Sequence, residues 1–216
     1  MKDNGKYLYC YKMTHDTGFA PNVDHGVLTL ATCKPTIRRC AEIGFWISGW
    51  ASNVVQGKDK EYTDKGQKLI YLAKVTDKIP IEEYWEKYDY KRPKKIPTGK
   101  EMTTNSCGGK KSVSGFIYNM GDNIYKPIKG RKGKFKQLPN GGGHGEDNIK
   151  RDLSGKFVLI STEYYYFGVE QATKIEVEKN FVVPRCKKIP LDNEKAQRII
   201  ERVKEKYELE KKPKQL

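Results

Sequence analysis

The sequence predicts an α+β protein built on a small curved or barrel-like, mainly antiparallel β-sheet, with peripheral helices and a C-terminal helix. Several short apolar segments have the length and composition of buried strands, and helical patterns do not alternate with them in a βαβ rhythm. With 216 residues, the chain is long enough for one well-buried core. We therefore expect a single domain over residues 1–190, followed by an amphipathic helix and a lysine-rich tail over residues 191–216.

Strands are expected where aromatic and β-branched residues gather between turn-forming residues. Their alternation is weak, which is typical of strands that are buried on both faces. The expected strands are Tyr7–Met13, Val27–Thr32, Phe45–Ala51, Lys68–Val75, Phe116–Met120 and Phe157–Ser161, with a further aromatic segment over Tyr164–Gly168.

Three helical segments are expected. Thr36 is the expected N-cap of a helical turn that runs to Ile43, and Gly44 has the residue type of a helix C-terminus. Ile79–Trp85 carries a proline and two acids, which favour the first turn of a helix. Apolar side chains at helical spacing predict an amphipathic helix over Asp192–Leu209.

Two segments have the composition of loops. Lys91–Lys100 is rich in proline and lysine and is expected to be exposed. Residues 126–145 are dense in lysine and glycine, so we expect a flexible basic loop that buries little apolar surface. His144, near the end of this loop, is a candidate lid residue, or simply part of a solvated loop.

The charge is strongly positive, because 42 Lys and Arg residues against 27 Asp and Glu residues give +15. Such a surface attracts polyanions, so we expect nucleic acid or a nucleotide as the partner. Lysine used only for solubility is the alternative, and protein partners stay open. The chain has no P-loop, no Rossmann glycine motif and no zinc-deaminase signature, which argues against those enzyme classes.

The cysteines do not form a scaffold pattern. There are five, at Cys10, Cys33, Cys40, Cys107 and Cys186, and no two have C-x-x-C spacing. We therefore expect reduced thiols in a cytoplasmic protein, with no structural zinc and no metal site. No long apolar run occurs near the N-terminus, so neither a signal peptide nor a membrane span is expected. The sequence identifies no cofactor.

The segment from Asp16 to Arg39 concentrates polar residues on loop-forming sequence. His25 is a candidate general base or acid, with Asp16 or Asp24 as the carboxylate that would fix its tautomer. A pair that only caps the turn is the alternative.

Cys33 ends an expected strand and precedes an expected helix start. A thiol beside Lys34 and a helix N-terminus is a candidate nucleophile, with His25 as its base, although most free cysteines are small buried hydrophobes. Lys34, Arg38 and Arg39 together form a candidate phosphate site, in which only one of the two arginines is expected to serve.

Two aromatic segments offer faces on which a base could stack. Trp46 and Tyr166 are the candidates, and core packing is the alternative for both. Asp122 and Asn123 follow an expected strand and either bind a ligand or form an Asx-turn and no more.

The runs DTGFAPN, HGVLTLATCKPTIRR and GFWISGW, between Asp16 and Trp50, resemble the nucleotide modification associated domain 2 family of bacteria, archaea and phages. KLIYLAKV, EEYW, GDNIY and FVLISTEYYYFG extend the resemblance in one order as far as about Pro184. A weaker resemblance links the chain to PUA-like and EVE-like domains, which hold modified bases or RNA. The family pattern has an acidic residue after the glycine of its G-x-W-I element, where this chain has Phe45.

The resemblance implies association with hypermodified DNA bases or nucleotides, which favours DNA over RNA as the nucleic acid partner. It also implies a set of site residues. Three hypotheses follow: an enzyme that modifies a base or nucleotide, a non-catalytic reader of a modified base, and an interaction subunit of a modification or defence system. The site residues implied by the resemblance are Asp16, Asn22, His25, Cys33, Lys34, Arg38 and Arg39, with Asp122, Asn123 and Tyr125 as a second wall.

Overall fold

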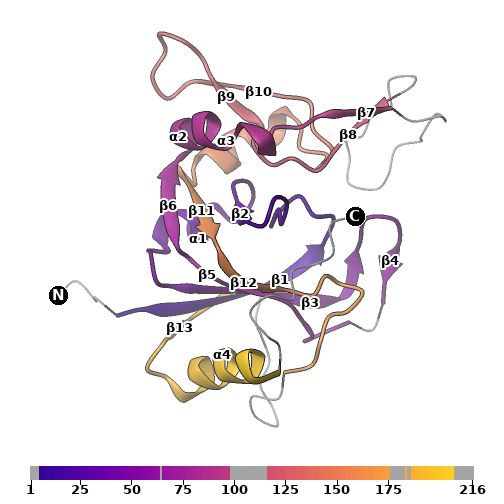
Figure 1. Ribbon diagram of the computed structural model, residues 1–216, viewed down its shortest axis with the longest axis vertical. Coiled ribbons are helices and arrows are strands. Elements are labelled where there is room, and N and C mark those ends of the chain that lie inside the picture. The colour runs from indigo at the N-terminus through magenta and orange to yellow at the C-terminus, as the bar shows by residue number, and fades with distance from the viewer. Residues whose placement is uncertain (1–4, 64, 98–115, 176–182, 184–185, 207–216) are drawn as a thin grey trace.

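The computed structural model describes residues 5–63, 65–97, 116–175, 183 and 186–206. Its main sheet has six strands in the order β12-β5-β3-β1-β13, with β4 paired to β3 (Figure 1). The bounds of these strands are β1 Tyr7–His15, β3 Trp46–Gln56, β4 Glu61–Tyr62, β5 Leu69–Lys74, β12 Glu163–Tyr166 and β13 Cys186–Pro190.

The main sheet is mixed and open. β1 pairs in parallel with β3, while its other pairs are antiparallel. Parallel neighbours need a crossover, and here the chain between β1 and β3 passes through β2 (Leu28–Leu30) and α1 (Pro35–Cys40). The α+β class is therefore confirmed. Of the two predicted shapes, curved or barrel-like, a closed barrel is wrong for the described strands, because β12 and β13 are edges of the sheet.

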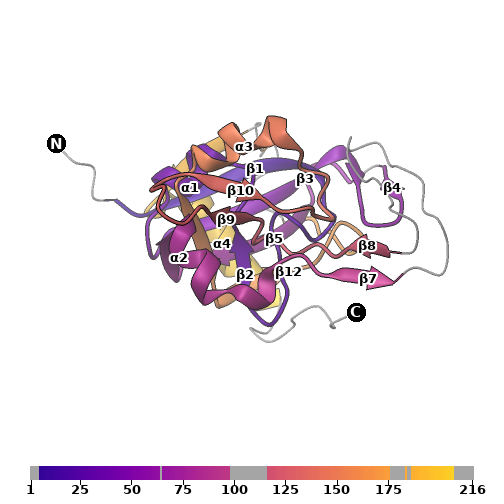
Figure 2. The ribbon, with the colours of Figure 1, turned by 90° about the horizontal axis from the view of Figure 1, so that it is seen from above.

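A second layer lies above the main sheet in Figure 1. It contains a small antiparallel sheet in the order β2-β11-β6, with α2 and α3 close to it. Two hairpins complete this layer, and β7–β8 extends away from the rest of it (Figure 2). The remaining bounds are β6 Asp77–Pro80, α2 Ile81–Lys87, η1 Asp89–Lys91, β7 Lys95–Pro97, β8 Phe116–Tyr118, β9 Tyr125–Pro127, β10 Phe135–Gln137, α3 Glu146–Leu153 and β11 Phe157–Ser161.

Helix α4 (Glu194–Lys206) covers the opposite face of the main sheet, at the bottom of Figure 1. Its apolar side chains, among them Ile199 and Val203, pack against sheet residues such as Trp50 and Leu72. The expected C-terminal helix is therefore confirmed over its described part, while residues 207–216, which include the expected tail, lie outside the described residues. None of the described helices is long and apolar enough to cross a membrane.

Helix α1 differs from the expectation at both ends. It begins at Pro35 with Lys34 as N-cap, no side chain caps it, and its C-cap is Ala41, so Thr36 as N-cap is wrong. Cys33 and Lys34 both have left-handed backbone, with φ of 56° and 38°, and this turn places the proline at the first helical position.

The two expected loops contain more structure than their composition indicated. Within residues 126–145, β9 and β10 form a hairpin, although the expected flexibility of this segment stays a prediction. The expected exposure of Lys91–Lys100 is wrong at Lys91, whose side chain is buried, and Lys95–Pro97 is a strand. Residues 98–100 of this predicted loop lie outside the described residues. Helix α3 was not expected, since its sequence is mainly polar.

Candidate active site

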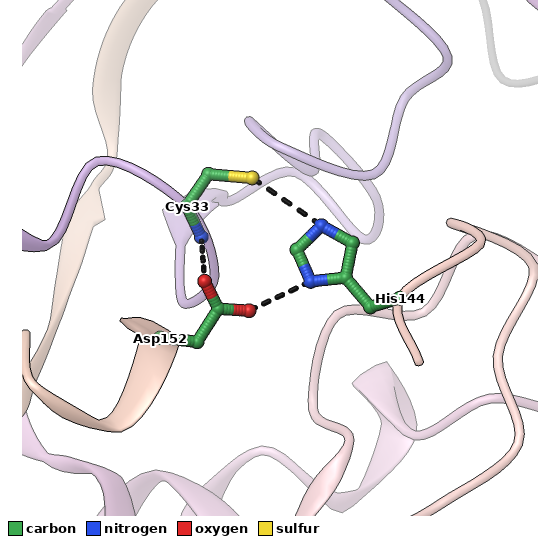
Figure 3. Close-up of side chains that lie close together, drawn as sticks. All are labelled: Cys33, His144 and Asp152. Atoms are coloured by element: carbon green, nitrogen blue, oxygen red, sulfur yellow. Dashed lines mark hydrogen bonds and ion pairs between the residues drawn. The ribbon is translucent and has the colours of Figure 1, made fainter. Parts of the chain in front are cut away.

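A cysteine from the turn before α1, and a histidine and an aspartate from the loop before α3 and from α3 itself, form a hydrogen-bonded row (Figure 3). Cys33 Sγ lies 3.4 Å from His144 Nε2, and His144 Nδ1 lies 2.7 Å from Asp152 Oδ2. The other oxygen of Asp152 accepts a hydrogen bond from the backbone N–H of Cys33 at 3.0 Å. We call Cys33, His144 and Asp152 the triad.

A buried arginine fixes the backbone at Cys33. Arg38 is fully buried, and its guanidinium donates to the carbonyls of Cys33 (2.8 Å), Phe157 (2.9 Å) and Asp152. One side chain therefore ties the turn that carries the thiol to the end of α3 that carries the carboxylate. Gly155 permits this packing, because a Cβ there would lie 2.5 Å from the Arg38 Cζ.

His144 lies in the loop between β10 and α3, and side chains of that loop hold its backbone. Asn140 Nδ2 donates to the His144 carbonyl at 3.0 Å, and the His144 N–H donates to Asn140 Oδ1 at 3.1 Å. Gln137 donates to the same carbonyl, and the ring of Phe19 packs edge-on against the imidazole at 4.9 Å. The imidazole is therefore held between an aromatic ring and a fixed loop.

Asp152 is fully buried near the end of α3. Besides its bonds to Cys33 and His144, its carboxylate accepts a hydrogen bond from the Tyr125 hydroxyl at 2.8 Å. A buried carboxylate costs free energy unless it is well hydrogen-bonded, and three donors supply this here. The arrangement orients the imidazole and leaves its second nitrogen facing the thiol.

The charges of the triad reinforce one another. Burial lowers the pKa of His144, but hydrogen bonds to Asp152 and Cys33, with their negative charges, outweigh burial and raise that pKa to about 9. Burial raises the pKa of Asp152, but the hydrogen bond and charge of His144 hold it below its usual value. At neutral pH the imidazole is therefore protonated, and it places a positive charge beside the Cys33 sulfur.

Folding stability should depend on pH through His144. Because the folded pKa of about 9 exceeds the ordinary 6.5, its contribution is full below about pH 6.5 and is lost as pH rises through 9. The difference corresponds to about 3 kcal/mol. Urea unfolding across this range should show a larger loss of unfolding free energy in the wild type than in His144→Gln. Parallel curves for the two proteins would contradict this assignment.

The triad also offers three ligand types that a metal ion could use. The candidate ligand atoms of Cys33, His144 and Asp152 lie within 4.8 Å of one another. Asp152 and Cys33, however, contact opposite nitrogens of the imidazole, so an ion between Sγ and Nε2 would have Asp152 as a partner of the histidine rather than as a ligand. Catalytic zinc commonly has three protein ligands, whereas this geometry leaves two, Cys33 and His144. The row therefore fits nucleophilic catalysis better than metal binding.

Comparison with known proteins supplies the family. The model of nucleotide modification associated domain 2 matches residues 5–214, nearly the whole chain. The chain belongs to this family. No curated protein and no solved structure matches it. Membership in nucleotide modification associated domain 2 associates the protein with nucleotide modification, and the triad lies within the matched domain.

His25 and Asp16, both predicted as catalytic residues, lie in separate environments. His25 is half exposed, lies 3.1 Å from Asp24 and packs against the Tyr90 ring at 4.8 Å. Asp16 is buried and accepts hydrogen bonds from the Tyr166 hydroxyl and the Val169 N–H. The described hydrogen bonds thus pair Cys33 with His144, and His25 with Asp24. The roles predicted for His25 and Asp16 stay predictions.

Three further candidates belong to a buried polar network that ties the loop before β2 to the strand edge near β9. Asn22 donates to the carbonyls of Gly18 and Met120, while Asp122 accepts from Thr29 and Tyr84. Asn123 donates to the carbonyls of Tyr84 and Tyr88. Lys91 completes the network, and burial lowers its pKa to about 8. These contacts are structural, and ligand binding by Asn22, Asp122 and Asn123 stays a prediction.

The expected phosphate cluster divides into a buried and an exposed part. The guanidinium of Arg38 is engaged by three carbonyls, while Arg39 is exposed and donates to the carbonyl of Ser154 at 3.3 Å. The Lys34 ammonium lies over the ring of Tyr11, 4.4 Å from its centroid. Of the two arginines, Arg39 is the one placed to meet a ligand from solvent.

The aromatic candidates lie mostly inside the protein. Trp46 is buried in the core between the main sheet and α4, and Tyr166 is half-buried and bonded to Asp16. Phe45, where the resemblance implied an acid, is buried and packs against Tyr7 and Tyr9. A carboxylate at position 45 would therefore have to be accommodated among aromatic rings. Base stacking by Trp46 or Tyr166 stays a prediction.

Asp152 is the functional candidate that sequence reasoning missed. The acids Glu146 and Asp147 in the first turn of α3 are the usual signal of a helix start and could have indicated the helix. Nothing in the local sequence shows that Asp152 faces inward toward Cys33. Tyr125, expected in a second wall, contacts the triad through its hydroxyl.

Proposed function

We propose that this protein is an enzyme of nucleotide or DNA base modification that uses Cys33 as a nucleophile. The observation that carries the proposal is the row from Cys33 Sγ through His144 to the buried Asp152 carboxylate. A nucleophile, a histidine in hydrogen-bond reach and a group that orients the histidine form the general pattern of covalent catalysis. Family membership supplies the link to nucleotides.

The chemistry assigned to the triad is covalent transfer at an electrophilic carbon. In this mechanism Cys33 reacts as a thiolate beside the protonated imidazole. Its Sγ donates an electron pair to that carbon, and the leaving group departs with the electrons of its former bond. His144 gives the leaving group a proton. Water or an acceptor then attacks the same carbon and releases Cys33, and the proton of the attacking group returns to His144. Asp152 holds the imidazole in place throughout.

A reader that binds a modified base without chemistry is the other class of function. Such a protein has no use for a thiol, an imidazole and a carboxylate in a row, and the aromatic rings suggested for stacking are largely buried. DNA is the substrate that we favour over RNA, because family resemblance implies hypermodified DNA bases.

Mass spectrometry of nucleosides tests the proposal. Cells that produce the wild-type protein should contain a changed nucleoside, in DNA or in the nucleotide pool, that cells without it lack. Cys33→Ala should remove the change completely, whereas Cys40→Ala, an exposed cysteine in α1, should leave it intact. A nucleoside change that persists in the Cys33→Ala protein would rule out the covalent mechanism.

A further inference from the structure

The β9–β10 hairpin has one face toward the triad and one face toward solvent. Tyr125 pairs with Gln137 in its register, and these two residues contact Asp152 and the His144 carbonyl. The next pair, Lys126 and Lys136, is exposed. Alternate residues of a strand point to opposite faces, so the hairpin links the triad directly to a charged outer surface.

The outer surface is uniformly basic. Residues 126–137 contain six Lys and Arg residues and no acid, and all six are exposed: Lys126, Lys129, Arg131, Lys132, Lys134 and Lys136. Like charges directly opposite one another in an antiparallel pair are destabilising, and Lys126 and Lys136 are such a pair. None of the six forms an ion pair with the acids of the described chain, so an external anion would relieve their repulsion.

The position of the charges indicates the size of the ligand. Lys129 to Lys134 lie in the turn of the hairpin, which projects from the upper layer in Figure 1, and Gly130 and Gly133 there have open space around them. The turn cations are at least three residues from Tyr125 or Gln137, about 10 Å along an extended strand. A polynucleotide carries a phosphate about every 3.4 Å along each strand, so it can contact the triad and the turn at once.

We propose that the β9–β10 hairpin binds the phosphate backbone of a polynucleotide and so brings a base of that strand to the triad. This rests on the proposed function and deepens it, because it selects a polymer over a free nucleotide as the substrate class. An anionic membrane is less suitable as a partner, since Ile128 is the exposed large apolar side chain of the hairpin and membrane-binding surfaces need more buried apolar area.

Oligonucleotide binding at several salt concentrations tests the proposal. Gln replaces Lys129, Arg131, Lys132 and Lys134 in one variant, and Lys187, Lys188, Arg202 and Lys204 in a control. The control residues are exposed and lie on β13, an edge strand of the main sheet, and on α4, which covers the face of that sheet opposite the upper layer. Both variants carry +11, since four charges are removed from +15. The readouts are the affinity for labelled single-stranded DNA, duplex DNA and RNA, and its dependence on salt.

The hairpin variant should bind about tenfold or more weakly, with a salt dependence reduced by roughly two to three released ions, while the control changes little. Equal weakening in both variants, or no weakening in the hairpin variant, would overturn the proposal. So would hairpin-dependent binding to phosphatidylserine vesicles without binding to oligonucleotides. Cys33→Ala should bind as the wild type does, so a failed covalent mechanism would leave the binding result unaffected. Equal thermal unfolding temperatures show that the variants are folded.

Discussion

Asp152→Asn is expected to reduce formation of the modified nucleoside by about 10³- to 10⁴-fold, while the protein stays folded. The carboxylate accepts hydrogen bonds from the Cys33 N–H, the His144 imidazole and the Tyr125 hydroxyl. An amide keeps the shape but replaces one acceptor by a donor and removes the negative charge. The imidazole then loses the partner that fixes its orientation and supports its positive charge. Nucleoside mass spectrometry measures the loss.

Asp147→Asn is the matched control, because it makes the same isosteric change at an exposed residue of α3. It should leave nucleoside formation within about twofold of the wild type, because a surface charge near a helix N-terminus contributes about 1 kcal/mol or less. Full activity in Asp152→Asn would show that the carboxylate is a structural anchor with no part in the chemistry.

Arg38→Met is expected to lower the free energy of unfolding by about 3–5 kcal/mol, the largest stability effect that we predict. The substitution leaves the carbonyls of Cys33, Asp152 and Phe157 without their donor in a buried place. It also removes a positive charge that, after the hydrogen bond and charge of His144 and the hydrogen bond of Tyr125, helps to hold the pKa of Asp152 low. Urea unfolding at neutral pH measures the change.

The neighbouring arginine provides the control for that experiment. Arg39→Met should change the free energy of unfolding by less than about 1 kcal/mol, because Arg39 is exposed and makes one long hydrogen bond. Arg38→Lys should not restore stability, since an ammonium cannot present the three fixed donors of a guanidinium. An Arg38→Met protein as stable as Arg39→Met would contradict the bridging role.

The fold class and most strands could be predicted from the sequence because burial leaves a local signal. Tyr7–Met13 and Phe157–Ser161 are runs of large apolar residues, and both are strands. The parallel pairing of β1 with β3 left no such signal, because it depends on the crossover through α1. The described sheet is open at β12 and β13, so of the two predicted shapes, curved or barrel-like, the closed barrel was wrong.

The candidate site was predicted in part, and the division has a physical cause. Cys33 could be predicted as a candidate nucleophile because Lys34 and a helix start follow it directly in sequence. Its partner, His144, lies 111 residues away in the β10–α3 loop, so the local sequence does not indicate it. His25 is much nearer in sequence, but its left-handed backbone and its contact with Asp24 place it in a separate turn. Arg38 has the residue type of a phosphate ligand, yet its three donors are directed at backbone carbonyls.

The rate at which iodoacetamide alkylates Cys33 tests most directly whether the triad activates this thiol. Peptide mapping at neutral pH follows Cys33 beside Cys40 and Cys186, which are exposed and serve as internal references. The wild-type Cys33 should react faster than both references although it is less exposed, and His144→Gln should remove that advantage. Equal rates for Cys33 in the wild type and in His144→Gln would contradict a catalytic triad at this site.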